Sequence, residues 1–245
     1  GRFHHLMKAF VKLPGLRLLG ASQALLHRVS RRYEKPGFAL ERTEVLGREV
    51  HVSEQVVASE PFCRLLRFVR ASDDPAIAAS LRTQPRVLVC APLSGHHASL
   101  LRDTVRSLLR DHDVYVTDWL DAREVPLAAG DLGLDGYVRT IQRFIRALDA
   151  QNLHVLAVCQ PTAPVLAAVS LLAQAGEPTP RSLTLMGGPV DASRSPTEVN
   201  RLATGRSIAW FERNMIHTVP DRYVGRGRRV YPGFVQLTAF MSMNP

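Results

Sequence analysis

The sequence predicts an α/β fold, a mostly parallel β-sheet with helices on both of its faces. Two kinds of segment alternate along its middle. Short apolar runs rich in β-branched residues predict strands, and these runs are 86–91, 114–117, 154–158 and 182–186. Apolar residues at helical spacing predict helices between them, over 100–109, 137–148 and 164–175. Strands that are apolar throughout are typical of parallel sheets buried on both faces.

The flanking segments have other patterns. Residues 1–30 have a helical period, whereas alternating patterns at 44–57 and 62–69 predict two strands ahead of the main sheet. After 190 the sequence becomes polar, with a short helical pattern at 202–216 and an Arg/Gly-rich loop at 222–229. We therefore expect three parts, which are an N-terminal helical segment at 1–40, an α/β-hydrolase core at 41–190 and the start of a lid or cap insertion at 191–245. Because the sequence begins at Gly1 and ends at Pro245, we expect a fragment whose sheet is incomplete at the C-terminal end.

Composition excludes several classes of protein. The 245 residues are 46% hydrophobic, enough for one substantial core, and no apolar run approaches the ~20 residues of a transmembrane helix. The net charge is +9, but the 28 arginines are spread along the whole chain, which does not favour nucleic-acid binding. Three widely spaced cysteines argue against disulfides and zinc and favour a reducing, cytoplasmic compartment. We expect no cofactor.

The junction around Cys159 carries the strongest chemical signal. A predicted strand ends at Val158 and a helix begins two or three residues after Cys159, and α/β-hydrolases place their nucleophile at such a turn. The glycines of the Gly-x-Ser-x-Gly signature are replaced by Ala157, which is small, and Pro161, which suits a first helical turn.

The chemistry of a cysteine suits that turn. Partial positive charge at the helix N-terminus favours the thiolate, which can attack an ester carbonyl and form a thioester. The alternative is that Cys159 is only a small buried apolar residue at the end of a strand. The turn by itself leaves these two interpretations about equally weighted.

The loop after the first core strand predicts the second part of a hydrolase site. It reads Leu93-Ser94-Gly95-His96-His97. Hydrolases build their oxyanion hole from a main-chain N–H in this loop and the N–H that follows the nucleophile. We therefore predict the Gln160 N–H together with that of Leu93 or Ser94. Adjacent histidines on an irregular loop rarely bind one metal ion without further ligands, so we predict no metal site.

Several segments resemble those of the intracellular polyhydroxyalkanoate depolymerases of bacteria, from about Tyr33 to the end of the chain. The matching segments are 61–66, 91–96, 101–105, 118–123, 158–161, 185–189, 231–234 and 241–244. The resemblance is specific because the Cys-Gln-Pro turn and the Leu-Ser-Gly-His loop recur at the expected separation.

The resemblance implies an α/β-hydrolase that cleaves ester bonds of amorphous poly(3-hydroxybutyrate) at storage granules in the cytoplasm, with Cys159 as nucleophile. It also implies an aspartate and a histidine from late strands of the sheet, which we expect beyond Pro245. Asp191 and His217 are an alternative acid and base, which we disfavour because no strand precedes His217. Two other functions stay open, an acyltransferase of the polyester synthase type and a granule-binding module without turnover.

Overall fold

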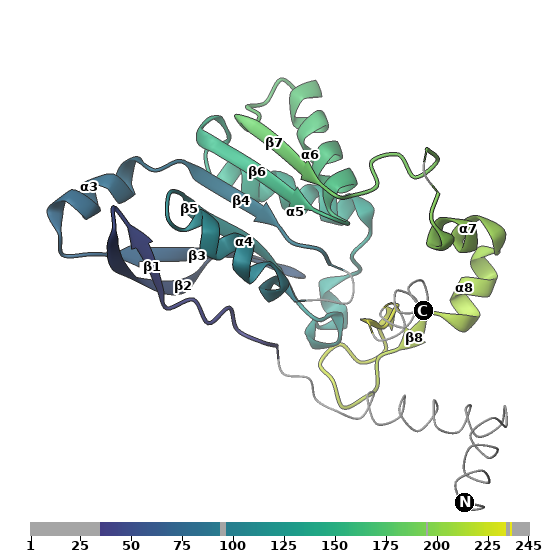
Figure 1. Ribbon diagram of the computed structural model, residues 1–245. Coiled ribbons are helices and arrows are strands. Elements are labelled where there is room, and N and C mark those ends of the chain that lie inside the picture. The colour runs from purple at the N-terminus through teal and green to yellow at the C-terminus, as the bar shows by residue number, and fades with distance from the viewer. Residues whose placement is uncertain (1–34, 94–96, 195, 234–235, 237–245) are drawn as a thin grey trace, which may run out of the picture. The chain divides into compact units, whose positions relative to one another are not determined.

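The computed structural model describes residues 35–93, 97–194, 196–233 and 236 (Figure 1). The chain divides into two units, Gly1–Lys35 and Pro36–Pro245, and the sheet with its helices belongs to the second. The helix predicted within residues 1–30 and the oxyanion donor predicted at Ser94 lie outside the described residues.

A seven-stranded mixed sheet forms the centre of the second unit, in the order β1-β2-β3-β5-β4-β6-β7 (Figure 1). Its strands are β1 (Arg42–Val45), β2 (Arg48–Glu60), β3 (Cys63–Ala71), β4 (Arg86–Cys90), β5 (Asp113–Trp119), β6 (Leu153–Val158) and β7 (Ser182–Met186). The last four are parallel to one another, and β1 to β3 form an antiparallel edge. All four predicted core strands are confirmed.

The antiparallel edge differs from the prediction at one point. The segment predicted as one strand from residue 44 is two strands, β1 and β2, joined at Leu46 and Gly47. Both residues have positive φ, 52° and 74°, as a tight two-residue hairpin turn of type I′ requires. Leucine is rare in that conformation, and the sequence therefore gave little indication of the turn.

Helices α4 (Arg102–Leu108), α5 (Leu134–Ala147) and α6 (Thr162–Gln174) confirm the three predicted helices. A further helix, α3 (Pro75–Thr83), was not predicted. The Asp74 carboxylate caps it by accepting hydrogen bonds from the N–H groups of Ala76 and Ile77. The short 3₁₀ helices are η1 (Ala98–Leu101), η2 (Ala122–Glu124), η3 (Leu127–Ala129) and η4 (Ala150–Asn152).

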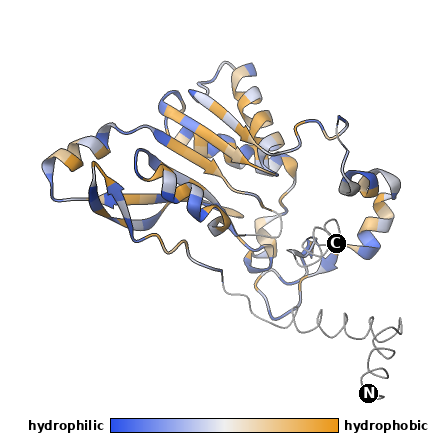
Figure 2. Cartoon of the chain, viewed as in Figure 1, coloured by the Kyte–Doolittle hydropathy of each residue, from blue (hydrophilic) through white to orange (hydrophobic). Residues whose placement is uncertain are grey.

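Two hydrophobic cores lie on opposite faces of the sheet. Successive strand residues point to opposite faces, so Leu88 of β4 packs with α5 and α6, whereas Val87 and Val89 pack with α4. Figure 2 shows hydrophobic residues along the central strands and over much of α6. The prediction of a sheet with helices on both faces is therefore confirmed.

The part after β7 contains α7 (Glu198–Gly205), α8 (Ile208–Asn214) and the short antiparallel pair β8 (His217–Thr218) and β9 (Arg229–Val230). The single helix predicted at 202–216 is thus two helices. Arg206 between them has extended backbone, and the Ser207 hydroxyl caps α8 at the Trp210 N–H.

A buried arginine attaches this part to the core. Arg228 is 3% exposed, and its guanidinium donates hydrogen bonds to the carbonyl oxygens of Val125 and Pro126, at 3.3 and 2.8 Å. It also pairs with Asp131 at 3.0 Å and lies over the Phe62 ring. The segment around β9 is therefore fixed against the loop that contains η2 and η3. Its role as a lid stays a prediction.

Candidate active site around Cys159

Cys159 lies in the tight bend between β6 and α6. Its φ is 66°, a left-handed conformation that is strained for a residue other than glycine and that recurs at functional sites. Cys159 is exposed, whereas Cys63 and Cys90 are buried. The exposed position contradicts the alternative that Cys159 is a buried apolar residue at the end of its strand.

Hydrogen bonds on either side of Cys159 hold the bend. The Cys159 N–H donates to the Met186 carbonyl oxygen at 2.7 Å, and the Cys159 carbonyl oxygen accepts from the Thr162 N–H at 3.1 Å. The Val165 N–H donates to the Pro161 carbonyl oxygen at 2.9 Å and continues the helix. The bend is therefore held both by the end of β7 and by the first turn of α6.

Gly188, just after β7, packs against the bend. A methyl group at this position would overlap the Cys159 carbonyl oxygen and the Thr162 hydroxyl, and it would come within 2.5 Å of Thr162 Cγ2. The sequence patterns did not predict this close approach. The only signal for it in the sequence is the pair of glycines directly after the strand.

The loop after β4 lies at the same edge of the sheet as Cys159. The parallel strands β4 and β6 are in register at Cys90 and Ala157, so the residues that follow them leave the sheet side by side. The Ala91 N–H donates to the Thr117 hydroxyl at 2.9 Å, and the Leu93 N–H donates to Gln160 Oε1 at 2.9 Å. Two of the three residues predicted to supply oxyanion donors are therefore brought together. The sequence predicted a role for the Gln160 main-chain N–H but none for its side chain.

No side chain of the described residues hydrogen-bonds to the Cys159 sulfur. Asp191 accepts hydrogen bonds from the Ser193 hydroxyl and N–H, at 2.6 and 2.9 Å, and these bonds lower the pKa of Asp191. Its remaining side-chain partner is Arg194, so the partners that its carboxylate has in the described structure are Ser193 and Arg194. The disfavoured pair of Asp191 with His217 is therefore not assembled.

The other two cysteines belong to the core. Cys63 and Cys90 lie in one cluster with Trp119 and Tyr137, whose rings stack at 4.3 Å. Burial raises the pKa of Cys90 to about 12 and also raises the pKa of Tyr137. Because a thiol is reactive only as thiolate, Cys90 is unsuited to attack at neutral pH.

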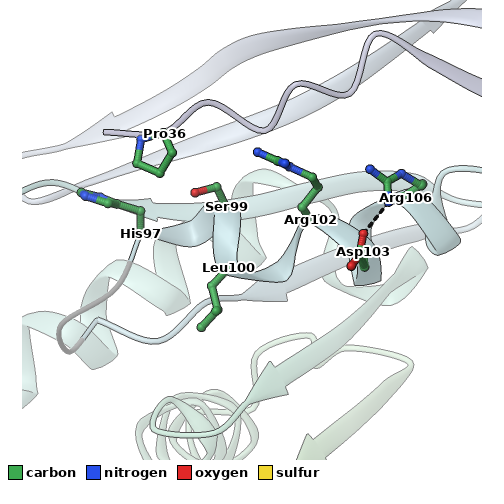
Figure 3. A pocket seen from close by; sticks show the side chains of 7 residues that line it. All are labelled: Pro36, His97, Ser99, Leu100, Arg102, Asp103 and Arg106. Atoms are coloured by element: carbon green, nitrogen blue, oxygen red, sulfur yellow. Dashed lines mark hydrogen bonds and ion pairs between the residues drawn. The ribbon is translucent and has the colours of Figure 1, made fainter. Parts of the chain in front are cut away.

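A shallow groove of about 560 Å³ runs beside α4, and Cys159 does not line it. Figure 3 shows Arg102 and Arg106 projecting towards the segment that carries Pro36, whereas Leu100 points away. Arg102 donates to the Gly37 carbonyl oxygen at 2.8 Å, and Arg106 pairs with Asp103. Both guanidinium groups are thus already engaged, and we assign no ligand to the groove.

Two classes of feature are absent from the described residues. No group of three or more histidine, cysteine, aspartate or glutamate side chains is arranged there to hold a metal ion. None of the helices described there is both long enough and apolar enough to cross a membrane.

The sheet order, the strand–turn–helix at Cys159 and the left-handed backbone of Cys159 define an α/β-hydrolase fold. Within that class, residues 187–245 match the family model described as PHB de-polymerase C-terminus. The match confirms the resemblance to polyhydroxyalkanoate depolymerases that the sequence motifs indicated. No curated protein matches the chain.

Solved structures similar to this chain include two enzymes from the metagenome of Lake Arreo, Spain. One is an alpha/beta hydrolase with 21% identity and a TM-score of 0.40, covering 79% of this chain and 64% of its own. The other is an ester hydrolase with 22% identity and a TM-score of 0.43, covering 78% and 64%. A hormone-sensitive lipase from a metagenome library has 13% identity and a TM-score of 0.42, covering 80% and 59%. This chain thus spans less than two thirds of the length of each.

Proposed function

We propose that this chain is part of a carboxylic ester hydrolase, an intracellular polyhydroxyalkanoate depolymerase that acts on amorphous poly(3-hydroxybutyrate) at granule surfaces in the cytoplasm. One observation carries the proposal. Cys159 is an exposed thiol in a strained left-handed bend between a core strand and its helix. The family match over residues 187–245 supports the polyester as substrate.

The proposed reaction begins with the Cys159 thiolate. Its sulfur attacks the carbonyl carbon of an ester in the polymer, and the carbonyl oxygen gains negative charge that the Gln160 N–H and an N–H of the loop after β4 stabilise. The alcohol end of the polymer leaves, and water hydrolyses the thioester. The charge-stabilising groups are main-chain N–H groups at the edge of the sheet where β4 and β6 end.

The proton transfers need further groups. No described histidine or carboxylate contacts the Cys159 sulfur, and Asp191 is occupied by Ser193 and Arg194. The proposal therefore includes a histidine and an aspartate from late strands of the sheet, as the resemblance to the depolymerases implies.

The test uses the full-length protein and a suspension of amorphous poly(3-hydroxybutyrate) granules. We expect wild-type protein to release soluble hydroxy acid and Cys159→Ala to release none while it still co-sediments with granules. Cys63→Ala is the matched control, because Cys63 is buried in β3, which is separated from β6 by β5 and β4 in the sheet, and it should retain hydrolysis. Hydrolysis by Cys159→Ala at the wild-type rate would refute the proposal. Polymer growth from an acyl-CoA would favour the synthase-type alternative, and binding without any hydrolysis by wild type would favour the binding module.

A further inference from the structure

The Gln160 side chain engages a main-chain group that the proposed chemistry needs. Gln160 Oε1 accepts a hydrogen bond from the Leu93 N–H at 2.9 Å, across the gap between the bend after β6 and the loop after β4. A main-chain N–H has a single hydrogen to donate. The Leu93 N–H therefore cannot bond fully to Gln160 and to a substrate oxygen at the same time.

We propose that, in the resting protein, the Gln160 side-chain oxygen accepts the hydrogen bond of the Leu93 N–H, one donor of the oxyanion hole. The side chain leaves this donor when negative charge develops on the substrate oxygen. This inference rests on the proposed function, since it takes Cys159 as the nucleophile. The 2.9 Å separation falls within the 2.7–3.1 Å expected between such a donor and an oxyanion. Gln160 Oε1 thus accepts the one hydrogen of the Leu93 N–H that a substrate oxygen would otherwise accept.

The other donor of the oxyanion hole is available to a substrate. The Gln160 N–H directly follows the nucleophile, and among the described residues it donates to no partner. Gln160 therefore has two opposite effects. Its main-chain N–H is one donor of the oxyanion hole, whereas its side-chain oxygen accepts the hydrogen bond of the other donor, the Leu93 N–H. Gln160 is partly accessible, so its amide can find water when it swings away.

The exchange should depend on charge. A neutral ester carbonyl and a neutral amide oxygen accept hydrogen bonds of similar strength, so a bound ester gains little by displacing Gln160. A hydrogen bond to an ionised oxygen is about twice as strong, so the oxyanion displaces the amide readily. The Leu93 donor would then act mainly in the transition state, which is the kind of interaction that raises the rate of the chemical step.

The test is binding of butyraldehyde to the full-length protein, measured by calorimetry. The Cys159 S–H adds across the aldehyde C=O, with a new S–C bond, the π electron pair moving to oxygen and the proton ending there. The tetrahedral product needs no other reactant, and its neutral hydroxyl oxygen can accept from the Leu93 N–H only where the Gln160 oxygen no longer does so. Gln160→Met has similar length without a strong acceptor, whereas Gln160→Glu keeps an acceptor and adds a negative charge.

We expect Gln160→Met to bind butyraldehyde about three- to tenfold more tightly than wild type, and Gln160→Glu to bind about tenfold more weakly. Alkylation of Cys159 by iodoacetamide, which needs no oxyanion hole, should proceed at equal rates in wild type and Gln160→Met and thus controls for the state of the thiol. Equal or weaker aldehyde binding by Gln160→Met would overturn the proposal. Binding by Cys159→Ala as tight as wild type would instead overturn the proposed function, so the two failures are distinguishable.

Discussion

Replacing Gly188 by alanine tests the packing that shapes the bend. The added methyl would lie 2.5 Å from Thr162 Cγ2, against 3.4–4 Å for ordinary contact, and would overlap the Cys159 carbonyl oxygen, which is main chain and cannot rotate away. Overpacking of a filled site costs about 1–3 kcal/mol, and the main-chain overlap places Gly188→Ala at about 3 kcal/mol or slightly more. For a chain of this size the melting temperature should fall by roughly 6–12 °C.

The neighbouring glycine is the control. Gly187 has φ 59° and no atom within 4 Å of an added methyl, so Gly187→Ala carries only the conformational cost of about 1–2 kcal/mol. Thermal unfolding by circular dichroism compares the two variants, and iodoacetamide measures whether the Cys159 thiol has changed its accessibility. We expect Gly188→Ala to be the less stable variant and to change the alkylation rate. A Gly188→Ala protein within about 0.5 kcal/mol of wild type would refute the packing argument.

Three further predictions concern Arg228 and the cysteines. Arg228→Met should lower the free energy of unfolding by about 2–4 kcal/mol, because the carbonyl oxygens of buried Val125 and of Pro126 lose the donor of a buried guanidinium, whereas Arg228→Lys should lose less. Urea denaturation measures both, and a loss below about 1 kcal/mol for Arg228→Met would contradict the anchoring role. At about pH 8, iodoacetamide should modify Cys159 alone in the native protein and all three cysteines in urea, and rapid native labelling of Cys63 or Cys90 would contradict their burial. Burial raises the pKa of Cys90 from 9.0 to about 12, so its contribution to stability is complete below about pH 9 and is lost as the pH rises towards 12. The melting temperature of wild type should therefore fall more steeply with pH over that range than the melting temperature of Cys90→Ala. Parallel dependences on pH would contradict the raised pKa of Cys90.

The sequence was sufficient for the core of the fold. Apolar runs identified all four strands β4 to β7. In β4 and β5 the apolar run follows from burial on both faces of the sheet. In β6 only alternate residues are buried, and in β7 none is, although both strands are largely apolar. The turn at Leu46-Gly47 escaped prediction because its first residue is not a usual turn residue. Helix α3 is short and half-exposed, with Ile77 as its one buried residue, and its apolar period is correspondingly weak.

The sequence was enough to predict the position of the thiol at Cys159, but not the contacts that surround it. The strand–helix junction identified the position of the thiol, since that signal is local. The packing of Gly188 on the bend and the bond from Leu93 to Gln160 join residues that are distant in sequence. A glutamine after the nucleophile does not by itself indicate where its side chain will bond. Those contacts depend on the register of β4, β6 and β7, which only the assembled sheet determines.

Trapping the acyl group tests the central role of the cysteine at position 159 most directly. Full-length protein is mixed with p-nitrophenyl butyrate, quenched in acid within the first turnover, digested and analysed by mass spectrometry. We predict a butyryl group on the peptide that contains Cys159, attached as a hydroxylamine-labile thioester. An acyl group on a serine or on another cysteine, formed at the rate of p-nitrophenol release, would contradict it.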